Sequence, residues 1–383
     1  MIPYGRQLIS EDDIAAVVGV LRSDFLTQGP AIPRFEAALA AKVGAHHAVA
    51  VNSATSALHI ACLALGVGPG DRVWTSPNSF VASANCARYC GGIADFVDID
   101  PHTYNMSVPA LREKLAAAEK DCALPKVVIP VHFSGQSCEM ADIWDLSRRY
   151  GFRIVEDASH AVGATYDDGF VGDCRYSDIC VFSFHPVKII TTGEGGLATT
   201  NDAELAFRMA TLRTHGITRD PARLDEKDPP PWYYEQQALG YNYRMIDIEA
   251  ALGLSQLARL DEFVERRNQL AVRYDQRLAE LPIVRPGVLS NRRSSFHLYV
   301  VRLPKRDPRR HRGVFEVMRG KGIGVNLHYM PIHLQPDYRR LGFEPGMFEE
   351  AEAYGETAIT LPLFPAMSED QQDQVVDALA AAL

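Results

Sequence analysis

A single lysine, Lys188, stands in a run of apolar and small residues, SFHPVKIITTGEGG at positions 183–196. The nearest acidic residue of this run is Glu194. Burial disfavours the ammonium form, so a buried lysine commonly has a lowered pKa and becomes a neutral amine. A neutral amine adds to aldehydes and ketones, which makes such a lysine suited to Schiff-base chemistry. The alternative is a lysine whose ammonium group reaches the surface along its aliphatic stem.

The second candidate is a carboxylate at the end of a β-rich run, RIVEDASHA at 153–161. In open α/β sheets, ligands bind beyond the carboxyl ends of the strands. Asp157 at such an end could pair with a protonated ring nitrogen of a bound heterocycle. The ordinary alternative is that Asp157 caps the N-terminus of a helix.

The third candidate is an anion site in VNSATSALH at 51–59. An apolar strand leads into small hydroxyl residues that open a helix. The free amides of that helix, with the hydroxyls of Ser53, Thr55 and Ser56, are suited to a phosphate monoester. Ordinary N-capping explains the same residues.

An aromatic residue, Phe80, follows another expected strand in SPNSF at 76–80, where it could stack on a planar ring or pack in the core. An amine, a carboxylate, an anion site and an aromatic ring together match pyridoxal phosphate (PLP). GEGG at 193–196 lacks the glycine spacing of the dinucleotide fingerprint, and no long helix follows it. This excludes a nicotinamide cofactor at that position.

The elements that must position these residues alternate along the first 200 residues. Apolar, β-rich runs alternate with helical patterns, which predicts crossover connections and a mostly parallel α/β sheet covered on both faces. The expected strands are 47–51, 71–76, 94–99, 126–133, 152–157 and 178–184.

After residue 240 the pattern becomes helical. Residues 246–281 predict one long connecting helix that is broken near Pro282. A second unit is expected after residue 295, and the proline-rich segment 225–232 is interpreted as an exposed excursion. The expected elements of the second unit are a strand at 296–303, a helix at 313–322, a strand at 323–330 and a helix after Ser368.

Composition excludes several classes of protein. The net charge of -9 argues against a general nucleic-acid binder. No apolar stretch approaches the roughly 18 residues that span a bilayer, and the start, MIPYGRQLISEDD, lacks the layout of a secretory signal. Seven scattered cysteines indicate reduced thiols in a cytoplasmic protein, and Cys86 and Cys90 are interpreted as helix packing and not as a metal site. These cysteines are Cys62, Cys86, Cys90, Cys122, Cys138, Cys174 and Cys180.

The combination of NSATSALH, EDASHAVGA, SFHPVKIITTGEGG and GYNYRM resembles the DegT/DnrJ/EryC1/StrS family of sugar aminotransferases essentially from end to end. The resemblance implies the fold of the aspartate aminotransferase-like, type I PLP enzymes. It implies a large PLP-binding domain at 12–250 with a mostly parallel seven-stranded sheet. A smaller α+β domain would comprise 251–383 together with the N-terminal segment 1–11.

Family roles transfer by position. The resemblance implies that Lys188 forms the Schiff base with PLP and moves protons, that Asp157 binds the pyridine nitrogen and that His160 lies near the ring, where many relatives have glutamine. Phe80 would stack on the ring, and Asn242 would reach the phosphate from the neighbouring subunit of a homodimer. The remaining phosphate-binding residues would be Ser53, Ala54, Thr55 and Ser183.

Further segments (MIPYGRQ, SDFLTQGPAIPRFE, DIDPHTYNMS and VNLHYMPIHLQPDY) resemble the branch of the family that makes the 4-amino sugar of the pseudaminic acid pathway. The implied reaction moves the amino group of L-glutamate to C4 of UDP-2-acetamido-2,6-dideoxy-β-L-arabino-hex-4-ulose. The product would be UDP-4-amino-4,6-dideoxy-N-acetyl-β-L-altrosamine. The implied nucleotide-sugar residues are Tyr4, Asp24, Phe25, Leu26, Thr27, Asn326, Leu327, His328 and Tyr329, with Ala54, Ser183 and Asn242.

Two alternatives stay open from the sequence. One is an aminotransferase for another UDP- or dTDP-linked keto-6-deoxy sugar, and the other is a PLP-binding regulator without turnover. Lys188 excludes the dehydratase branch of the family, in which histidine replaces the lysine. The substrate's diphosphate needs cations, and the candidates are Arg219, Arg292, Arg293 and the run 305–312, although a basic run is more often a solvated face.

Overall fold

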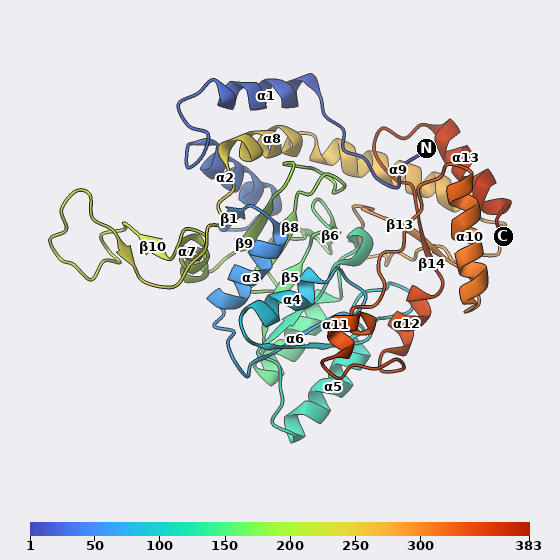
Figure 1. The fold of residues 1–383 in the computed structure, drawn as a ribbon, viewed down its shortest axis with the longest axis horizontal. Coiled ribbons are helices and arrows are strands. Elements are labelled where there is room, and N and C mark those ends of the chain that lie inside the picture. Colours follow the sequence, from blue (N-terminus) through green and yellow to red (C-terminus); the bar gives the residue numbers. More distant parts are fainter.

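A seven-stranded sheet forms the centre of the larger unit in the computed structural model, which describes residues 1–383 (Figure 1). The strand order is β1-β9-β8-β5-β4-β2-β3. Neighbouring strands run parallel except β9, which is antiparallel to both β8 and β1. The predicted mostly parallel α/β sheet is therefore confirmed. Its strands are β1 (His47–Val51), β2 (Arg72–Thr75), β3 (Ile93–Phe96), β4 (Val127–Ile129), β5 (Arg153–Asp157), β8 (Ile179–Ser183) and β9 (Gly196–Thr200).

Helices cover both faces of this sheet because successive strand residues point to opposite sides. Val155 belongs to the core under α3 (Ala54–Ala64), α4 (Ala82–Tyr89) and α7 (Ala203–Leu212). Its neighbour Ile154 packs in the core on the other side. The helices of that side are α2 (Ala31–Val43), α5 (Val108–Lys120), α6 (Met140–Tyr150) and α8 (Asp247–Leu257). Helix α1 (Glu11–Leu21) lies on the outside of α8 (Figure 1).

The prediction of a single long helix at 246–281 is wrong in its continuity. The chain forms α8 and then α9 (Leu260–Arg277), separated at Ala258 and Arg259. The interruption lets Leu257 and Leu260, on either side of it, bury in the same core. A continuous helical pattern in the sequence does not reveal such a break, because the apolar spacing continues through it.

The smaller unit has its own core around a two-stranded sheet of β13 (Tyr299–Arg302) and β14 (Ala358–Leu361). The N-terminal segment joins this unit, because Ile2 pairs with Ile323 and is buried in the same core. The unit also contains α10 (Pro308–Gly320) and α13 (Glu369–Ala380). Between them lie the 3-10 turn η2 (Ile332–Leu334), α11 (Pro336–Arg339) and α12 (Glu349–Gly355), and Ile332 of η2 and Tyr338 of α11 are buried in the core of the larger unit. The domain boundary after residue 250 stays a prediction; that position lies inside α8.

The strand predicted for 323–330 is wrong, since this segment forms only single bridges, Ile2 to Ile323 and Asn326 to Thr360. Side chains take the place of a neighbouring strand: the amide of Leu327 donates to Asn326 Oδ1, and that of Tyr329 donates to Asn78 Oδ1. The basic run 305–312 opens α10 at the edge of the smaller unit (Figure 1).

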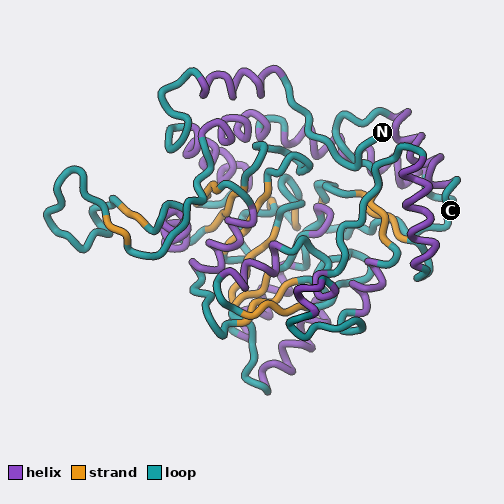
Figure 2. Tube along the Cα trace, in the orientation of Figure 1, coloured by secondary structure: helices purple, strands orange, loops and turns teal.

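A projection extends from the larger unit at residues 217–236. It is loop except for the short strand pair β10 (Ile217–Thr218) and β11 (Glu235–Gln236) (Figure 2). The exposed excursion predicted for 225–232 lies in it, and Trp232 is 77% exposed. The other short elements are β6 (Thr165–Tyr166), β7 (Gly169–Phe170), β12 (Arg292–Arg293) and the 3-10 turn η1 (Phe133–Gly135). All seven cysteines are free thiols, and no helix is both long and apolar enough to cross a bilayer.

Candidate active site

Lys188 lies in the connection between β8 and β9, near the carboxyl ends of β5 and β8. Its side chain is partly exposed and forms no salt bridge, since Glu194 lies nearer to His185, at 4.0 Å. Desolvation lowers the pKa of Lys188 from 10.5 to about 8, against the opposing attraction of the Asp157 carboxylate. A substantial fraction of this amine is therefore neutral near physiological pH.

Asp157 ends β5 and is buried. Its Oδ2 accepts a hydrogen bond from Ser83 Oγ at 2.6 Å, and its Oδ1 accepts from Ser159 Oγ at 2.6 Å and from the Ser159 amide at 3.1 Å. No helix begins there, so the helix-cap alternative does not apply. The carboxylate forms no salt bridge with a lysine or arginine, which leaves its charge available for a cationic group of a ligand.

The N-terminus of α3 supplies free amides. Ser53 is the N-cap, and its Oγ accepts from the amide of Ser56 at 3.1 Å. The amides of Ala54 and Thr55 have no acceptor within the protein. Ser56 is not a free donor, because its hydroxyl bonds Asn52 Oδ1 at 2.7 Å.

A glycine brings the next strand close to this helix end. A Cβ at Gly196 would lie 2.6 Å from the Ser53 carbonyl oxygen and would overlap the amide nitrogen of Ala54. Gly196 pairs with Ser183, the last residue of β8, and no protein group accepts a hydrogen bond from the Ser183 hydroxyl. Free amides at a helix N-terminus beside a free hydroxyl fit a phosphate group.

A ring cluster faces the same region. His160 Nδ1 accepts from the amide of Ser134 at 3.3 Å, and His160 Nε2 lies 3.1 Å from the Tyr329 hydroxyl. The two rings are stacked at a centroid distance of 6.1 Å. Phe80 lies 6.1 Å from the Tyr329 ring and is 58% exposed, so it is not a core residue. An exposed aromatic side chain at this position is free to stack on a planar ligand.

Two further histidines lie in this cluster: His328, which the sequence analysis implied as a nucleotide-sugar residue, and His297, which it missed. His297 stacks on His160 at 4.4 Å, and burial lowers the pKa values of both imidazoles well below 6.5. Burial and the nearby Lys188 charge lower the pKa of His328 to about 3. Three neutral imidazoles therefore line the region around Lys188. His297 carried no sequence signal, because it lies in a β-rich run of core residues.

The expected nucleotide-sugar residues divide into two groups. The rings of Tyr4 and His328 pack with their centroids 5.1 Å apart, and the side-chain Nδ2 of Asn326 lies 3.3 Å from His328 Nε2. These residues therefore adjoin the ring cluster. Leu327 is the connecting residue of this segment. The segment Asp24–Thr27 makes no hydrogen bond to the cluster. Thr27 instead pairs with Ile246, and Phe25 and Leu26 are exposed.

Asn242 also makes no hydrogen bond to the ring cluster within one chain. It is exposed and its backbone pairs with Thr214. Of the candidate cations, Arg293 forms an ion pair with Glu265 and Arg292 donates to the Ser137 carbonyl. Arg219 lies over the Tyr234 ring of the projection. None of these arginines belongs to the ring cluster.

Residues 7–380 match the model of the DegT/DnrJ/EryC1/StrS aminotransferase family. The chain belongs to this family. A GDP-perosamine synthase from Caulobacter vibrioides is 38% identical over 360 residues, which cover 93% of this chain and 91% of the relative. The putative sugar aminotransferase Spr1654 of Streptococcus pneumoniae superposes in its pyridoxamine phosphate form with a TM-score of 0.90 at 30% identity, covering 100% of this chain and 99% of that one.

Helicobacter pylori PseC, described as an aminotransferase in the biosynthesis of pseudoaminic acid, superposes with a TM-score of 0.89 at 29% identity. That match covers 100% of this chain and 98% of PseC. As a DegT/DnrJ/EryC1/StrS aminotransferase, the protein is a PLP-dependent sugar aminotransferase with the type I fold, as the sequence predicted. The free amides of α3, the close approach at Gly196 and the unpaired carboxylate of Asp157 fit the phosphate and ring nitrogen of PLP.

Proposed function

We propose that the protein moves the amino group of L-glutamate to C4 of a UDP-linked 4-keto-6-deoxy-N-acetylhexosamine, UDP-2-acetamido-2,6-dideoxy-β-L-arabino-hex-4-ulose. The product is the corresponding 4-amino sugar, a precursor of pseudaminic acid. The observation that carries the proposal is the ring cluster. Tyr4 and the segment 326–329 of the smaller unit meet His160 of the larger unit, and this region adjoins the lysine. The similarity to PseC over the whole chain supports the choice of sugar.

Each group of PLP has a proposed holder. The amides of Ala54 and Thr55, with the hydroxyl of Ser183, bind the phosphate, and the Ser53 cap holds that helix end in place. Asp157 binds the protonated ring nitrogen, and Phe80 and His160 contact the ring. When bound, PLP supplies a cationic conjugated ring that takes up the electron pair released as a C–H bond breaks.

Lys188 is the proposed general base and general acid. The ε-amino group of Lys188, with its pKa near 8, takes the proton from Cα of glutamate and later delivers a proton to C4 of the sugar. The neutral imidazoles of His160, His297 and His328 compete for no proton with this amine at neutral pH. One amine can therefore serve as base in one half-reaction and as acid in the other.

A homodimer completes the proposed site. Asn242 is exposed, as a residue that reaches the phosphate in the partner subunit must be. The segment Asp24–Thr27 presents Phe25 and Leu26 to solvent. Trp232 in the projection and Leu239 just after it are also exposed. Exposed apolar residues of this size favour an interface between subunits.

A second candidate substrate is another nucleotide-linked keto-6-deoxy sugar. The 38% identity to a GDP-perosamine synthase favours it, because that relative is named for a different nucleotide and a different amino sugar. A PLP-binding regulator without turnover is the third reading. A neutralised lysine beside an unpaired carboxylate, with neutral histidines around them, argues for turnover.

A substrate panel distinguishes these functions. The purified enzyme is incubated with L-glutamate and UDP-, dTDP- or GDP-linked 4-keto-6-deoxy sugars, and the configuration of each product at C4 and C5 is read by NMR. We expect the highest kcat/KM with the UDP-linked N-acetyl sugar. A preference for a GDP- or dTDP-linked ketone would contradict the proposed substrate. If the absorbance of the PLP-loaded protein changes neither with glutamate nor with any of the ketones, the result would instead support the regulator.

A further inference from the structure

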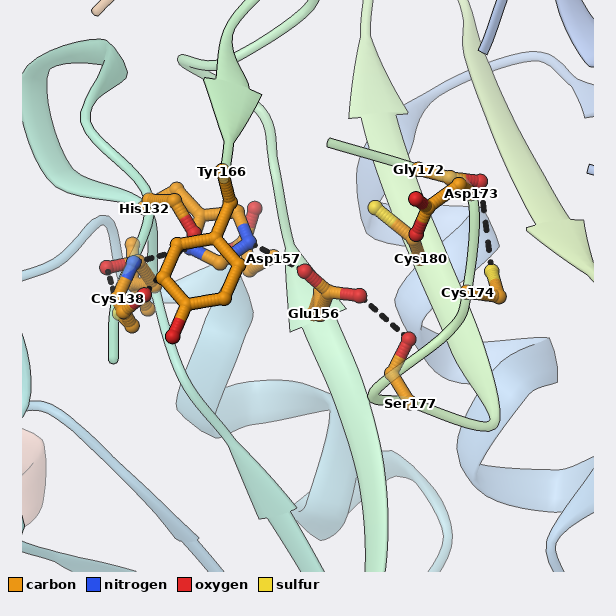
Figure 3. Close-up of polar contacts among 12 residues, drawn as sticks. His132, Cys138, Glu156, Asp157, Tyr166, Gly172, Asp173, Cys174, Ser177 and Cys180 are labelled. Carbon is orange, nitrogen blue, oxygen red and sulfur yellow. Dashed lines mark hydrogen bonds and ion pairs between the residues drawn. The ribbon is translucent and has the colours of Figure 1, made fainter. Parts of the chain in front are cut away.

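A buried carboxylate lies directly behind the proposed active site. Glu156 precedes Asp157 on β5, so its side chain points to the opposite face of the sheet. It is 5% exposed. Its Oε2 lies 2.6 Å from His132 Nε2, and its Oε1 accepts a hydrogen bond from the Ser177 hydroxyl (Figure 3). No lysine or arginine pairs with it.

The ring of His132 is fixed at both nitrogens. The amide of Cys138 donates to Nδ1 at 3.0 Å, so this nitrogen carries the lone pair and the proton resides on Nε2. Nε2–H then donates to the Glu156 carboxylate. The imidazole is fully buried, and the two contacts leave it one orientation and one tautomer (Figure 3).

The backbone at His132 continues into the 3-10 turn η1. The amide of His132 donates to the Asp157 carbonyl at 3.0 Å. Two residues later, Ser134 has a φ of 63°, in the left-handed region that non-glycine residues rarely adopt. Such a conformation persists only when the surrounding structure enforces it, and these conformations cluster at functional sites. The Ser134 hydroxyl donates to the Leu298 carbonyl at 2.6 Å, which fixes the other side of the turn.

The left-handed conformation of Ser134 directs its backbone N–H toward the proposed site. Ser134 N–H donates to His160 Nδ1 at 3.3 Å, which places the His160 proton on Nε2. Nε2–H then donates to the Tyr329 oxygen at 3.1 Å, so the hydroxyl proton of Tyr329 stays free to point at a bound substrate. Gly135 lets the turn η1 lie close to Ser295, since a Cβ at position 135 would lie 2.6 Å from Ser295 Oγ.

We propose that His132 and Glu156 are positioning residues, whose hydrogen bond holds η1 in the conformation in which the Ser134 amide selects the Nε2–H tautomer of His160. The pair acts from the opposite face of the sheet and touches neither cofactor nor substrate. The inference rests on the proposed function in one respect, that His160 contacts PLP.

Histidine ¹⁵N NMR on the full-length protein, before and after addition of PLP, tests the proposal. Nitrogen shifts distinguish a protonated from an unprotonated ring nitrogen. In the wild type we expect His160 to show only the Nε2–H form. Glu156→Gln should keep this signal, because the amide oxygen still accepts from His132 and the amide group can donate to Ser177. His132→Phe should lose the single tautomer of His160. It should also bind PLP about tenfold more weakly, by analogy with metal sites, where removing a hydrogen-bond partner of a ligand costs a similar factor in affinity.

The control is Cys180→Ala, which removes a buried thiol near the same face without a hydrogen bond to η1. It should lower the melting temperature and leave the His160 signal unchanged. A folded His132→Phe protein with an unaltered His160 tautomer would overturn the proposal, and so would a wild type protonated at Nδ1. If His132→Phe does not fold, Glu156→Leu takes its place, because leucine removes the acceptor for His132. A folded Glu156→Leu protein that loses the single His160 tautomer supports the proposal, and one with an unaltered tautomer overturns it. Turnover enters none of these outcomes, so an error in the proposed substrate leaves them unaffected.

Discussion

At the scale of single residues, the central feature is a lysine whose pKa is set more by burial than by a partner. Desolvation lowers the pKa of Lys188, and only the Asp157 carboxylate opposes that effect. The neighbouring imidazoles are neutral, so they add no cation that would compete for protons. An amine in these surroundings can add to an aldehyde at a pH where a surface lysine is protonated.

This arrangement predicts a pH dependence for the attachment of PLP. Above a pKa of about 8 the amine is mostly neutral, so the rate constant should rise with pH and level off above that value. Stopped-flow absorbance of the cofactor-free protein mixed with PLP measures it, and borohydride reduction followed by mass spectrometry locates the product.

Two variants are matched to this measurement. Because the Asp157 charge raises the pKa of Lys188, Asp157→Asn should move the midpoint to lower pH. Lys188→Ala should give no borohydride-stable product and should stay folded. A midpoint near 10.5, the ordinary value for lysine, would contradict the desolvation argument.

At the scale of elements, the proposed phosphate site depends on a helix end and a strand meeting at close range. Helix α3 follows β1, and β9 pairs with β1 and β8, so the start of β9 lies against the first residues of α3. Only glycine fits at position 196, because a side chain would overlap backbone atoms of the Ser53–Ala54 peptide. Backbone atoms cannot move aside as a flexible side chain can, so the helix end itself would shift.

Gly196→Ala should therefore weaken PLP and inorganic phosphate binding. Loss of one hydrogen bond to a charged group costs about 1.5–3 kcal/mol, which corresponds to roughly 10- to 100-fold in the dissociation constant. Fluorescence titration measures both ligands. The control is Gly313→Ala in α10, where an added Cβ meets no atom within 4 Å.

The control should stabilise its helix by about 0.5–1 kcal/mol and leave PLP binding unchanged. Unaltered phosphate affinity in a folded Gly196→Ala protein would show that the helix end is not the anion site.

At the scale of the whole molecule, a single chain brings together only part of the proposed site. Tyr4 and 326–329 of the smaller unit reach the larger unit, whereas Asn242 and Asp24–Thr27 make no hydrogen bond to the ring cluster. The projection at 217–236 extends away from its own sheet (Figure 1). Leu239 beyond it is 80% exposed. The proposed homodimer with two shared sites would account for these features.

Complementation between two inactive variants tests this arrangement. Lys188→Ala and Asn242→Ala damage different subunits of a shared site, so a mixed dimer contains one site with both residues intact. Random reassociation makes half of the dimers mixed, which should restore about one quarter of the wild-type activity.

Each variant alone, taken through the same dissociation and mixing, is the control and should stay nearly inactive. Sedimentation confirms that dimers have formed again. No recovery of activity in confirmed mixed dimers would show that Asn242 acts within its own chain.

Local signals predicted most of the sheet but not its seventh strand. The six predicted strands are rich in apolar, β-branched residues and are bounded by turn residues. The seventh, β9, is GLATT, a short run of small and hydroxyl residues, and only the family resemblance implied it. Its antiparallel direction follows from the short connection through Lys188, which leaves no room for a crossover helix.

The sequence by itself determined the reactive groups: a lysine without an acidic neighbour, a carboxylate at a strand end and a hydroxyl-rich helix start. Each of these signals is local, because burial and helix capping leave a pattern in neighbouring residues. The tertiary structure alone decided that His297 stacks on His160, that the Ser134 amide donates to that ring, and that Glu156 pairs with His132 on the opposite face of the sheet. These contacts join residues more than 20 positions apart. They form only when separate elements pack together, and a local sequence pattern does not report that packing.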